Sequence, residues 1–162
     1  MGLFDDIDPQ LEKAVNKGVG YLSHRERSIW EMRSYLKKKE FSPAVTTQAV
    51  DKLKGWGYLD DHRFAKLFIK SRMSSNPKST FALGCELKAK GISQEIIDDL
   101  TTELDNSDMA YESAMKKWNR WRRLDRESIK KKLMSHLRYR GFGYADSIQA
   151  WERISQELLD GD

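Results

Sequence analysis

The stretch Leu36-Lys37-Lys38-Lys39-Glu40-Phe41 is the most informative part of the sequence, because the chain repeats its pattern twice more. The pattern is a leucine, a base, any residue, a base, one variable residue and an apolar residue. It recurs at Leu87-Lys88-Ala89-Lys90-Gly91-Ile92 and at Leu137-Arg138-Tyr139-Arg140-Gly141-Phe142. The three leucines are 51 and 50 residues apart. This regular spacing indicates three tandem repeats of about fifty residues, each stacked on its neighbours.

Each copy of the pattern is predicted to end a helix. A second apolar residue precedes each leucine by four positions, at Met32, Leu83 and Leu133, so the two share one helix face. The bases that follow suit the negative C-terminal end of the helix dipole. A glycine in the second and third copies falls where helices commonly end in a left-handed residue. Glu40 in the first copy does not fit that pattern.

Three helices are predicted in the first repeat. Ser23-His24-Arg25-Glu26 has the spacing of a capping box and predicts the start of the second helix. Ser42-Pro43 predicts the start of the third. The apolar stripes of the three helices are Leu11, Val15, Val19 and Leu22, then Ile29, Met32 and Leu36, then Val45, Ala49, Leu53 and Trp56.

The second and third repeats follow the same plan. Asp60 or Asp61 can cap a helix, Ser74-Ser75-Asn76-Pro77 predicts a loop, and Ser93 and Gly143 precede the last helix of their repeats. The second repeat's stripes are Phe64, Ala65, Phe68 and Ile69, then Phe81, Leu83 and Leu87, then Ile96, Ile97, Leu100 and Leu104. The third repeat's stripes are Tyr111, Ala114, Trp118 and Trp121 on one helix, then Ile129, Leu133 and Leu137, then Ile148, Trp151, Ile154 and Leu158.

The predicted fold is therefore all-α, with nine helices in three tandem three-helix repeats. No stretch alternates apolar and polar residues for long enough to predict a strand. A chain of 162 residues could form one compact domain, but three repeats also allow an elongated array, which we expect. We place an N-terminal tail at residues 1–9 and the repeats at residues 10–58, 59–105 and 106–159.

The composition predicts a folded cytoplasmic protein. Charged residues make up 33% of the chain, but aromatic residues at 10%, five of them Trp, argue against disorder. No apolar run approaches the ~20 residues of a membrane span. Residues 1–10 carry three Asp and no base, unlike a signal or transit peptide. The single cysteine, Cys85, excludes an internal disulfide, and its helical setting predicts a structural thiol.

Basic residues concentrate in one region. Residues 116–140 hold eleven bases and two acids, a net charge of +9, whereas residues 1–115 have a net charge of −1 and residues 141–162 of −4. Most such runs are a solvated helix face, but the scarcity of acids here also suits a polyanion or an acidic protein surface. Trp118 and Trp121 lie among these bases, although their spacing favours the core. The candidate partner-binding residues are Lys116, Lys117, Arg120, Arg122, Arg123, Arg126, Lys130, Lys131, Arg138 and Arg140.

The sequence shows no sign of an enzyme or of a cofactor. His24, His62 and His136 have no second His or Cys at ligand spacing, so no metal site is predicted. Asp60-Asp61-His62 resembles an acid pair beside a base, but it stands where a helix cap is needed. The chain has no Gly-rich phosphate loop and no nucleophile elbow. We predict no catalytic residue.

The chain resembles the RecX family of bacterial recombination regulators, which modulate the RecA recombinase. The resemblance rests on Gly57-Tyr58-Leu59-Asp60-Asp61 with Arg63-Phe64-Ala65, on residues 86–92, on residues 137–142 and on residues 27–36, each in its repeat position. It covers about residues 10–157. Two departures are Asn76-Pro77-Lys78-Ser79 and Glu40, both at places where family members commonly have a glycine.

The resemblance implies a curved, elongated molecule of three three-helix repeats that binds along the groove of the RecA–DNA filament. It also implies inhibition of ATP hydrolysis, strand exchange and coprotease activity. An elongated array can contact several protomers, so that weak contacts add to a higher avidity. The alternative is a protein that binds DNA by itself through the basic region 116–140. We expect a monomer in either case.

Overall fold

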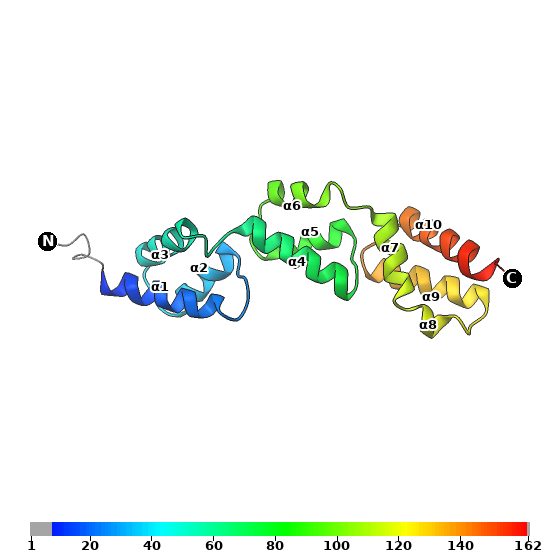
Figure 1. The fold of residues 1–162 in the computed structure, drawn as a ribbon, viewed down its shortest axis with the longest axis horizontal. Helices are drawn as coiled ribbons and strands as arrows, with labels where there is room; N and C mark the ends of the chain where they lie inside the picture. The colour runs from blue at the N-terminus through cyan, green and yellow to red at the C-terminus, as the bar shows by residue number, and fades with distance from the viewer. Residues whose placement is uncertain (1–7, 162) are drawn as a thin grey trace. The chain divides into compact units, whose positions relative to one another are not determined.

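The computed structural model describes residues 8–161, which form helices joined by turns, with no strand among them (Figure 1). The all-α prediction is therefore confirmed for these residues. The first seven residues of the predicted tail lie outside the described part. The helices are α1 (Pro9–Leu22), α2 (Ile29–Lys38), α3 (Pro43–Gly55), α4 (Asp61–Ser75), α5 (Thr80–Ala89), α6 (Gln94–Thr101), α7 (Asn106–Met115), α8 (Trp118–Trp121), α9 (Arg126–Tyr139), α10 (Tyr144–Ile154) and a π-helix (Ser155–Leu159).

Short polar side chains cap most helix starts, as the sequence predicts. Ser42 accepts a hydrogen bond from Val45 N (3.2 Å) at the start of α3, and Pro43 occupies the first helical position. Asp60 accepts from Arg63 N (3.0 Å) and caps α4. Such caps satisfy N–H groups that have no partner inside the helix.

The predicted capping box at Ser23–Glu26 is wrong. Ser23 ends α1 instead, and its hydroxyl donates to the carbonyl of Gly20 (2.6 Å). The N-cap of α2 is Ser28, which accepts from the main-chain N–H of Glu31 (3.1 Å). Ser28 and Glu31 have the same spacing as Ser23 and Glu26, so local sequence does not decide between the two starts.

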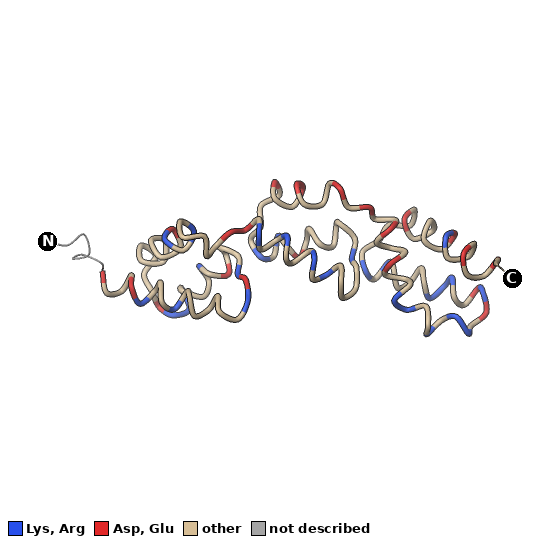
Figure 2. The backbone as a smooth tube through the Cα atoms, in the orientation of Figure 1, with Lys and Arg blue, Asp and Glu red and all other residues tan. Residues whose placement is uncertain are grey.

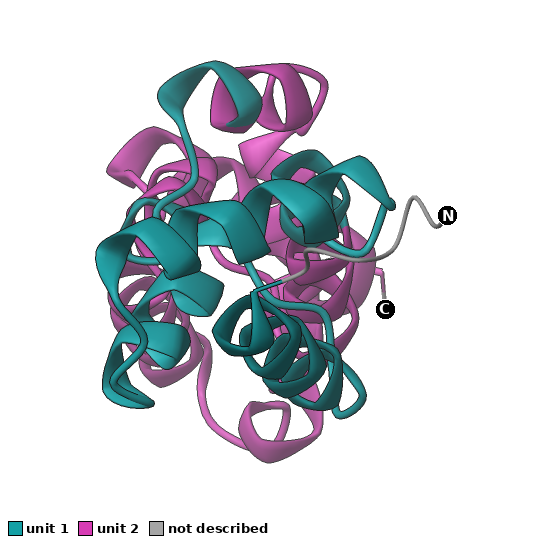
Figure 3. Cartoon of the chain, turned by 90° about the vertical axis from the view of Figure 1, so that its left-hand side faces the viewer, with its two compact units in different colours: residues 1–66, 87–96 teal, residues 67–86, 97–162 magenta. Residues whose placement is uncertain are grey.

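The chain divides into two compact units (Figure 3). The first holds residues 1–66 and 87–96, and the second holds residues 67–86 and 97–162. The division passes through α4, α5 and α6, so the middle three helices contribute to both units. The predicted repeat boundaries and the predicted elongated shape stay predictions.

In the first unit, α1, α2 and α3 pack around one apolar core. Met32 and Leu36 of α2 are fully buried, and the stacked rings of Tyr21 and Tyr35 join α1 to α2 with a centroid distance of 4.0 Å. The prediction that Trp56 is buried is wrong, because its side chain is 58% exposed. The buried core residues are Leu11, Ala14, Met32, Leu36, Ala49, Val50, Leu53 and Leu59.

In the second unit, α7, α9 and α10 enclose the other core. The predicted continuous helix from Tyr111 to Trp121 is interrupted, because α7 ends at Met115 and α8 begins at Trp118. Trp121 is nevertheless buried, as predicted. The buried core residues are Met109, Ala110, Ala114, Trp121, Ile129, Leu133, Leu137, Phe142, Ala150, Trp151 and Ile154.

Three further predictions need correction. The sequence places Phe81 on a buried stripe, but its side chain is 76% exposed. The last predicted helix stays α-helical only to Ile154, and Leu158 lies exposed in the π-helix that follows. Cys85 is exposed on α5, whereas its helical setting predicts a structural thiol.

Replacing Leu87 by Ala tests the apolar stripe of α5. The Leu87 side chain is fully buried, so the substitution leaves a cavity and should lower the free energy of unfolding by about 2–5 kcal/mol. Leu67→Ala is the matched control, because the Leu67 side chain is 46% exposed. This substitution should change the free energy of unfolding by no more than about 0.5 kcal/mol. Denaturant unfolding measures both, and equal stability of the two variants would contradict the assignment of Leu87 to the core.

Candidate partner-binding surface

Helix α9 forms the centre of the basic region. Asp125 caps it by accepting hydrogen bonds from Ser128 N (3.0 Å) and Ser128 Oγ (2.7 Å). Ile129, Leu133 and Leu137 are buried at helical spacing and fix the face that packs on the core. The rest of the helix surface carries the exposed bases Lys130, Lys131, Lys132 and Arg138. Figure 2 shows the bases gathered along α8 and α9.

Some predicted partner-binding bases make contacts inside the second unit. Lys116 donates to the main-chain carbonyls of Ser74 (2.5 Å) and Ser75 (2.9 Å) at the end of α4. Arg126 pairs with Asp160 (2.7 Å) and lies near the Trp151 ring. These contacts hold the two bases in place and reduce their availability to a partner.

Arg140 is also engaged. Its guanidinium donates to the carbonyls of Asn76 and Pro77, in the loop between α4 and α5. Lys117 is half-buried. The remaining candidates have exposed side chains with no side-chain hydrogen bond or ion pair within residues 8–161: Arg120, Arg122, Arg123, Lys130, Lys131 and Arg138.

Two open grooves lie beside α9. One of about 730 Å³ is lined by Lys131, Lys132 and Tyr139, and the other of about 620 Å³ by Lys130, Arg138 and Tyr144. Tyr139 is 87% exposed and Tyr144 is 75% exposed. Each groove therefore combines bases with an exposed tyrosine. Neither tyrosine is among the residues predicted from the sequence to bind a partner, although Tyr139 lies inside the repeated pattern.

His136 lines the first groove and is half-buried. Burial lowers the pKa of His136, and the nearby cations Lys117 and Arg140 lower it further. Its Nε2 lies 3.0 Å from the hydroxyl of Ser113, which donates in turn to Asn76 Oδ1 (3.2 Å). His136 thus belongs to a polar cluster that joins α7, α9 and the loop after α4.

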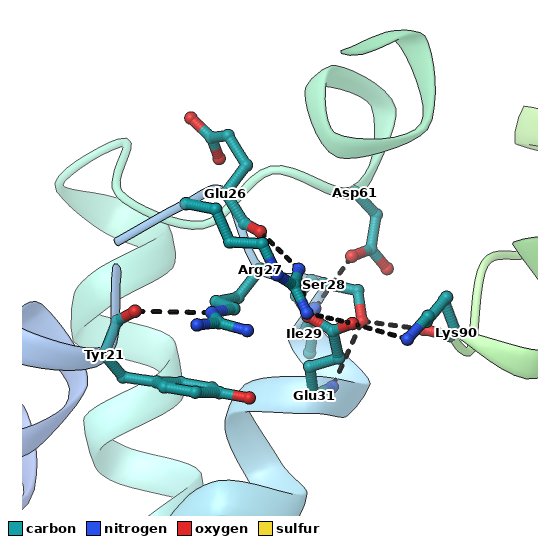
Figure 4. A network of polar contacts seen from close by, with 9 residues as sticks. Tyr21, Glu26, Arg27, Ser28, Ile29, Glu31, Asp61 and Lys90 are labelled. Atoms are coloured by element: carbon teal, nitrogen blue, oxygen red, sulfur yellow. Dashed lines mark hydrogen bonds and ion pairs between the residues drawn. The ribbon is translucent and has the colours of Figure 1, made fainter. Parts of the chain in front are cut away.

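A second cluster joins α2 to α4 and to the end of α5 (Figure 4). The hydroxyl of Ser28 donates to the carbonyl of Lys90 (2.7 Å). The main-chain N–H of Ile29, the first residue of α2, donates to Asp61 Oδ1 (2.8 Å). Burial raises the pKa of Asp61, and the hydrogen bond from Ile29 opposes that rise. The second repeat thus completes the start of α2, and we name these contacts the first junction.

Glu31 is the buried charge of the first junction. Only 5% of it is exposed, and Arg25 binds its carboxylate through two nitrogens at 2.9 and 3.2 Å. Lys90 Nζ lies 3.2 Å from the same carboxylate. Burial alone would raise the pKa of Glu31, but the hydrogen bonds and charges of Arg25 and Lys90 outweigh it and hold the pKa below its usual value.

A second junction has the same plan between the middle and last repeats. The main-chain N–H of Thr80, the first residue of α5, donates to Asn106 Oδ1 (2.9 Å). Ser79 N donates to the carbonyl of Arg140 (3.2 Å). Thr80 and Asn106 stand where Ile29 and Asp61 stand in the first junction. The start of α5, like that of α2, is therefore completed by the repeat that follows it.

Glycine occupies the variable position of the repeated pattern in both junctions for two reasons. Gly91 and Gly141 have positive φ values of 78° and 88°. A Cβ on Gly91 would also lie 2.3 Å from Trp30 Cβ, and one on Gly141 would lie 2.7 Å from Ser79 Oγ. Glu40 has a positive φ of 65° as well, so it ends α2 as the glycines end α5 and α9. Glu40 is exposed and belongs to the first of the three repeats.

No helix within residues 8–161 is long and apolar enough to cross a membrane. The same residues hold no group of three His, Cys, Asp or Glu side chains that could bind a metal ion.

The repeated helices and their junctions define an all-α tandem-repeat protein. Models of the first, second and third three-helix domains of RecX match residues 14–53, 60–100 and 104–151 in that order. The chain belongs to the RecX family. This confirms both the predicted resemblance and the predicted fold of three three-helix repeats.

Named relatives support this assignment. Regulatory protein RecX of Prosthecochloris aestuarii is 36% identical over 135 residues, which cover 83% of this chain and 89% of that protein. The same-named protein of Bacillus licheniformis is 31% identical over 154 residues, and the match spans 93% of this chain but 59% of that protein. The crystal structure of RecX from Lactobacillus salivarius has the same fold, with a TM-score of 0.77 at 19% identity over 91% of this chain and 97% of that one.

Gly91→Ala tests how closely the first junction is packed. The new methyl group would meet Trp30 and force a left-handed conformation on Ala. Gly57→Ala is the control, because Gly57 has a φ of 80° but nothing within 4 Å of an added Cβ. We expect Gly57→Ala to lower the free energy of unfolding by about 1–2 kcal/mol. Gly91→Ala should lower it by roughly 1–3 kcal/mol more. Equal unfolding free energies would show that the close approach is unimportant.

Glu31→Gln tests the buried ion pair by its pH dependence. A carboxylate whose pKa is lower in the folded state stabilises the fold above its unfolded pKa. That contribution is lost as the pH falls through the folded pKa. Wild type should therefore exceed the variant in stability at neutral pH, and the difference should shrink below about pH 5. Chemical unfolding at several pH values measures it, and a constant difference would contradict the assignment.

Proposed function

We propose that this chain binds the RecA filament on DNA and inhibits its ATP hydrolysis, strand exchange and coprotease activities. Membership of the RecX family supports a regulatory role, since the relatives are named regulatory proteins. The observation that carries the proposal is the exposed basic surface of α8, α9 and the turn between them. A partner with an acidic face, or with accessible phosphates, complements such a surface.

The contacts inside the second unit narrow the proposed binding surface. Lys116 and Arg140 bind main-chain carbonyls and Arg126 binds a carboxylate, so these bases act mainly within the fold. The exposed bases without such contacts are the better candidates for direct contact, and Lys117 adds to the local positive potential. The proposed contact residues are Arg120, Arg122, Arg123, Lys130, Lys131 and Arg138.

Direct DNA binding by the same surface is the second candidate function. Tyr139 and Tyr144 are exposed beside the bases of the two grooves, and exposed aromatic rings among bases can stack on nucleobases. DNA binding without RecA would show a steep salt dependence.

Charge reversal tests the surface. Arg122, Arg123, Lys130 and Lys131 are exposed, so replacing all four by Glu should leave the fold intact, as circular dichroism can check. We expect the variant to bind a RecA–single-stranded DNA filament at least about tenfold more weakly. Inhibition of the DNA-dependent ATP hydrolysis of RecA should weaken in parallel. Wild-type binding should fall as the salt concentration rises.

The matched control carries four reversals elsewhere, at Lys13, Lys17, Lys66 and Lys70, which are exposed on α1 and α4. It changes the net charge equally and should retain inhibition. A folded α9 variant that inhibits as well as wild type would refute the proposed surface. Equally weakened inhibition by both variants would show that net charge, and no particular surface, drives binding. Tight binding of DNA without RecA, abolished only in the α9 variant, would favour the second candidate.

A further inference from the structure

We propose that the outer face of α2 is a binding surface for single-stranded nucleic acid, with Trp30 as its stacking platform. This surface belongs to the first unit and is separate from the α9 surface. It combines an exposed indole ring, a shallow pocket and a row of bases that make few internal contacts. The proposal adds a second contact surface to the proposed function and can be tested without RecA.

Trp30 is exposed for a structural reason. Its position in the first turn of α2 is fixed by the first junction, because the main chain at Gly91 packs against the Trp30 Cβ. The core lies on the opposite side, under Met32 and Leu36, which leaves Trp30 52% exposed. An indole that is anchored at its base and open to solvent loses little side-chain entropy on binding.

A pocket of about 280 Å³ lies beside Trp30. Tyr21 and Tyr35 line it, and their rings are stacked at 4.0 Å. The guanidinium of Arg27 covers the outer face of this stack, 3.8 Å from the Tyr21 ring centre. These contacts fix the two tyrosines that line the pocket and leave Trp30 as the exposed aromatic ring beside it.

The charges around the pocket suit phosphate. Lys38 lines the pocket, and Arg33 and Lys37 are exposed on the neighbouring part of α2. The acid that also lines the pocket, Glu31, is 5% exposed, and its charge is met by Arg25 and Lys90. The face therefore presents positive charge to a ligand.

Nucleic acid fits these features better than an acidic protein segment. A carboxylate-rich peptide would use the bases but would leave the indole and the pocket without a partner. A single strand offers a partner to both features. Its nucleobases can stack on aromatic rings, and its phosphates pair with lysine and arginine side chains. The extended backbone of a single nucleic-acid strand also suits the basic side chains that continue along α2 beyond the pocket.

Binding of a fluorescent oligothymidylate to the full chain tests the inference. Trp30→Ala should weaken binding about fivefold or more, as removal of one base–aromatic stack predicts. Trp56→Ala is the matched control, because Trp56 is similarly exposed, at 58%, but lies in the apolar groove between α1 and α3. It should bind like wild type. Lys37→Ala with Lys38→Ala should reduce the dependence of binding on salt, by roughly 0.7 in the logarithmic slope for each phosphate that the variant no longer neutralises.

The outcomes separate this inference from the proposed function. No binding of the oligonucleotide by wild type at low salt, or equal binding by the two Trp variants, would overturn the inference. Failure of oligonucleotide binding only in the charge-reversed α9 variant would overturn it too, and would assign DNA to α9. RecA inhibition by the α9 variant tests the proposed function independently. If Trp30→Ala proves unstable, Trp30→Phe keeps a smaller ring and should bind between Trp30→Ala and wild type.

Discussion

The array of repeats depends on one kind of hydrogen bond. In it, the first N–H of the second helix of one repeat donates to a side chain of the next repeat. It joins Ile29 to Asp61 and Thr80 to Asn106. A helix start leaves N–H groups without partners inside the helix, and a buried N–H needs an acceptor. Because that acceptor comes from the following repeat, neither α2 nor α5 can complete its first turn alone. Stacking and helix formation are coupled in this fold.

The glycine of the repeated pattern follows from the same contact. Gly91 and Gly141 must adopt a positive φ and must also let the preceding repeat approach within a distance that no Cβ allows. Glu40, in the first of the three repeats, has to meet only the first demand. A non-glycine residue can take a left-handed conformation at a cost of about 1–2 kcal/mol, but it cannot remove its Cβ. The variable position of the pattern therefore distinguishes the first repeat from the two that follow it.

Helical spacing identifies much of the core, although it wrongly places Trp56 and Phe81 there. It does not predict features that depend on contacts distant in the sequence. Met32 with Leu36, and Leu133 with Leu137, are buried as their four-residue spacing predicts. Ser23 and Ser28 begin equivalent capping patterns, and the carbonyl of Lys90 selects Ser28 from 62 residues away. The basic region is visible in the sequence as a run of charge. The sequence does not show which of these bases are held by contacts within the fold, because Lys116 and Arg140 bind carbonyls 41 to 64 residues away.

The two bases of the repeated pattern have different roles. The second base reaches the preceding repeat in both junctions, where Lys90 pairs with Glu31 and Arg140 binds the loop after α4. In the first copy that base is Lys39, which lies near the Tyr35 ring of its own repeat. The first base is exposed in all three copies, at Lys37, Lys88 and Arg138. Attraction to the helix dipole acts on both bases alike and does not explain this difference. In both junctions the second base binds the preceding repeat, whereas the first base remains exposed to solvent.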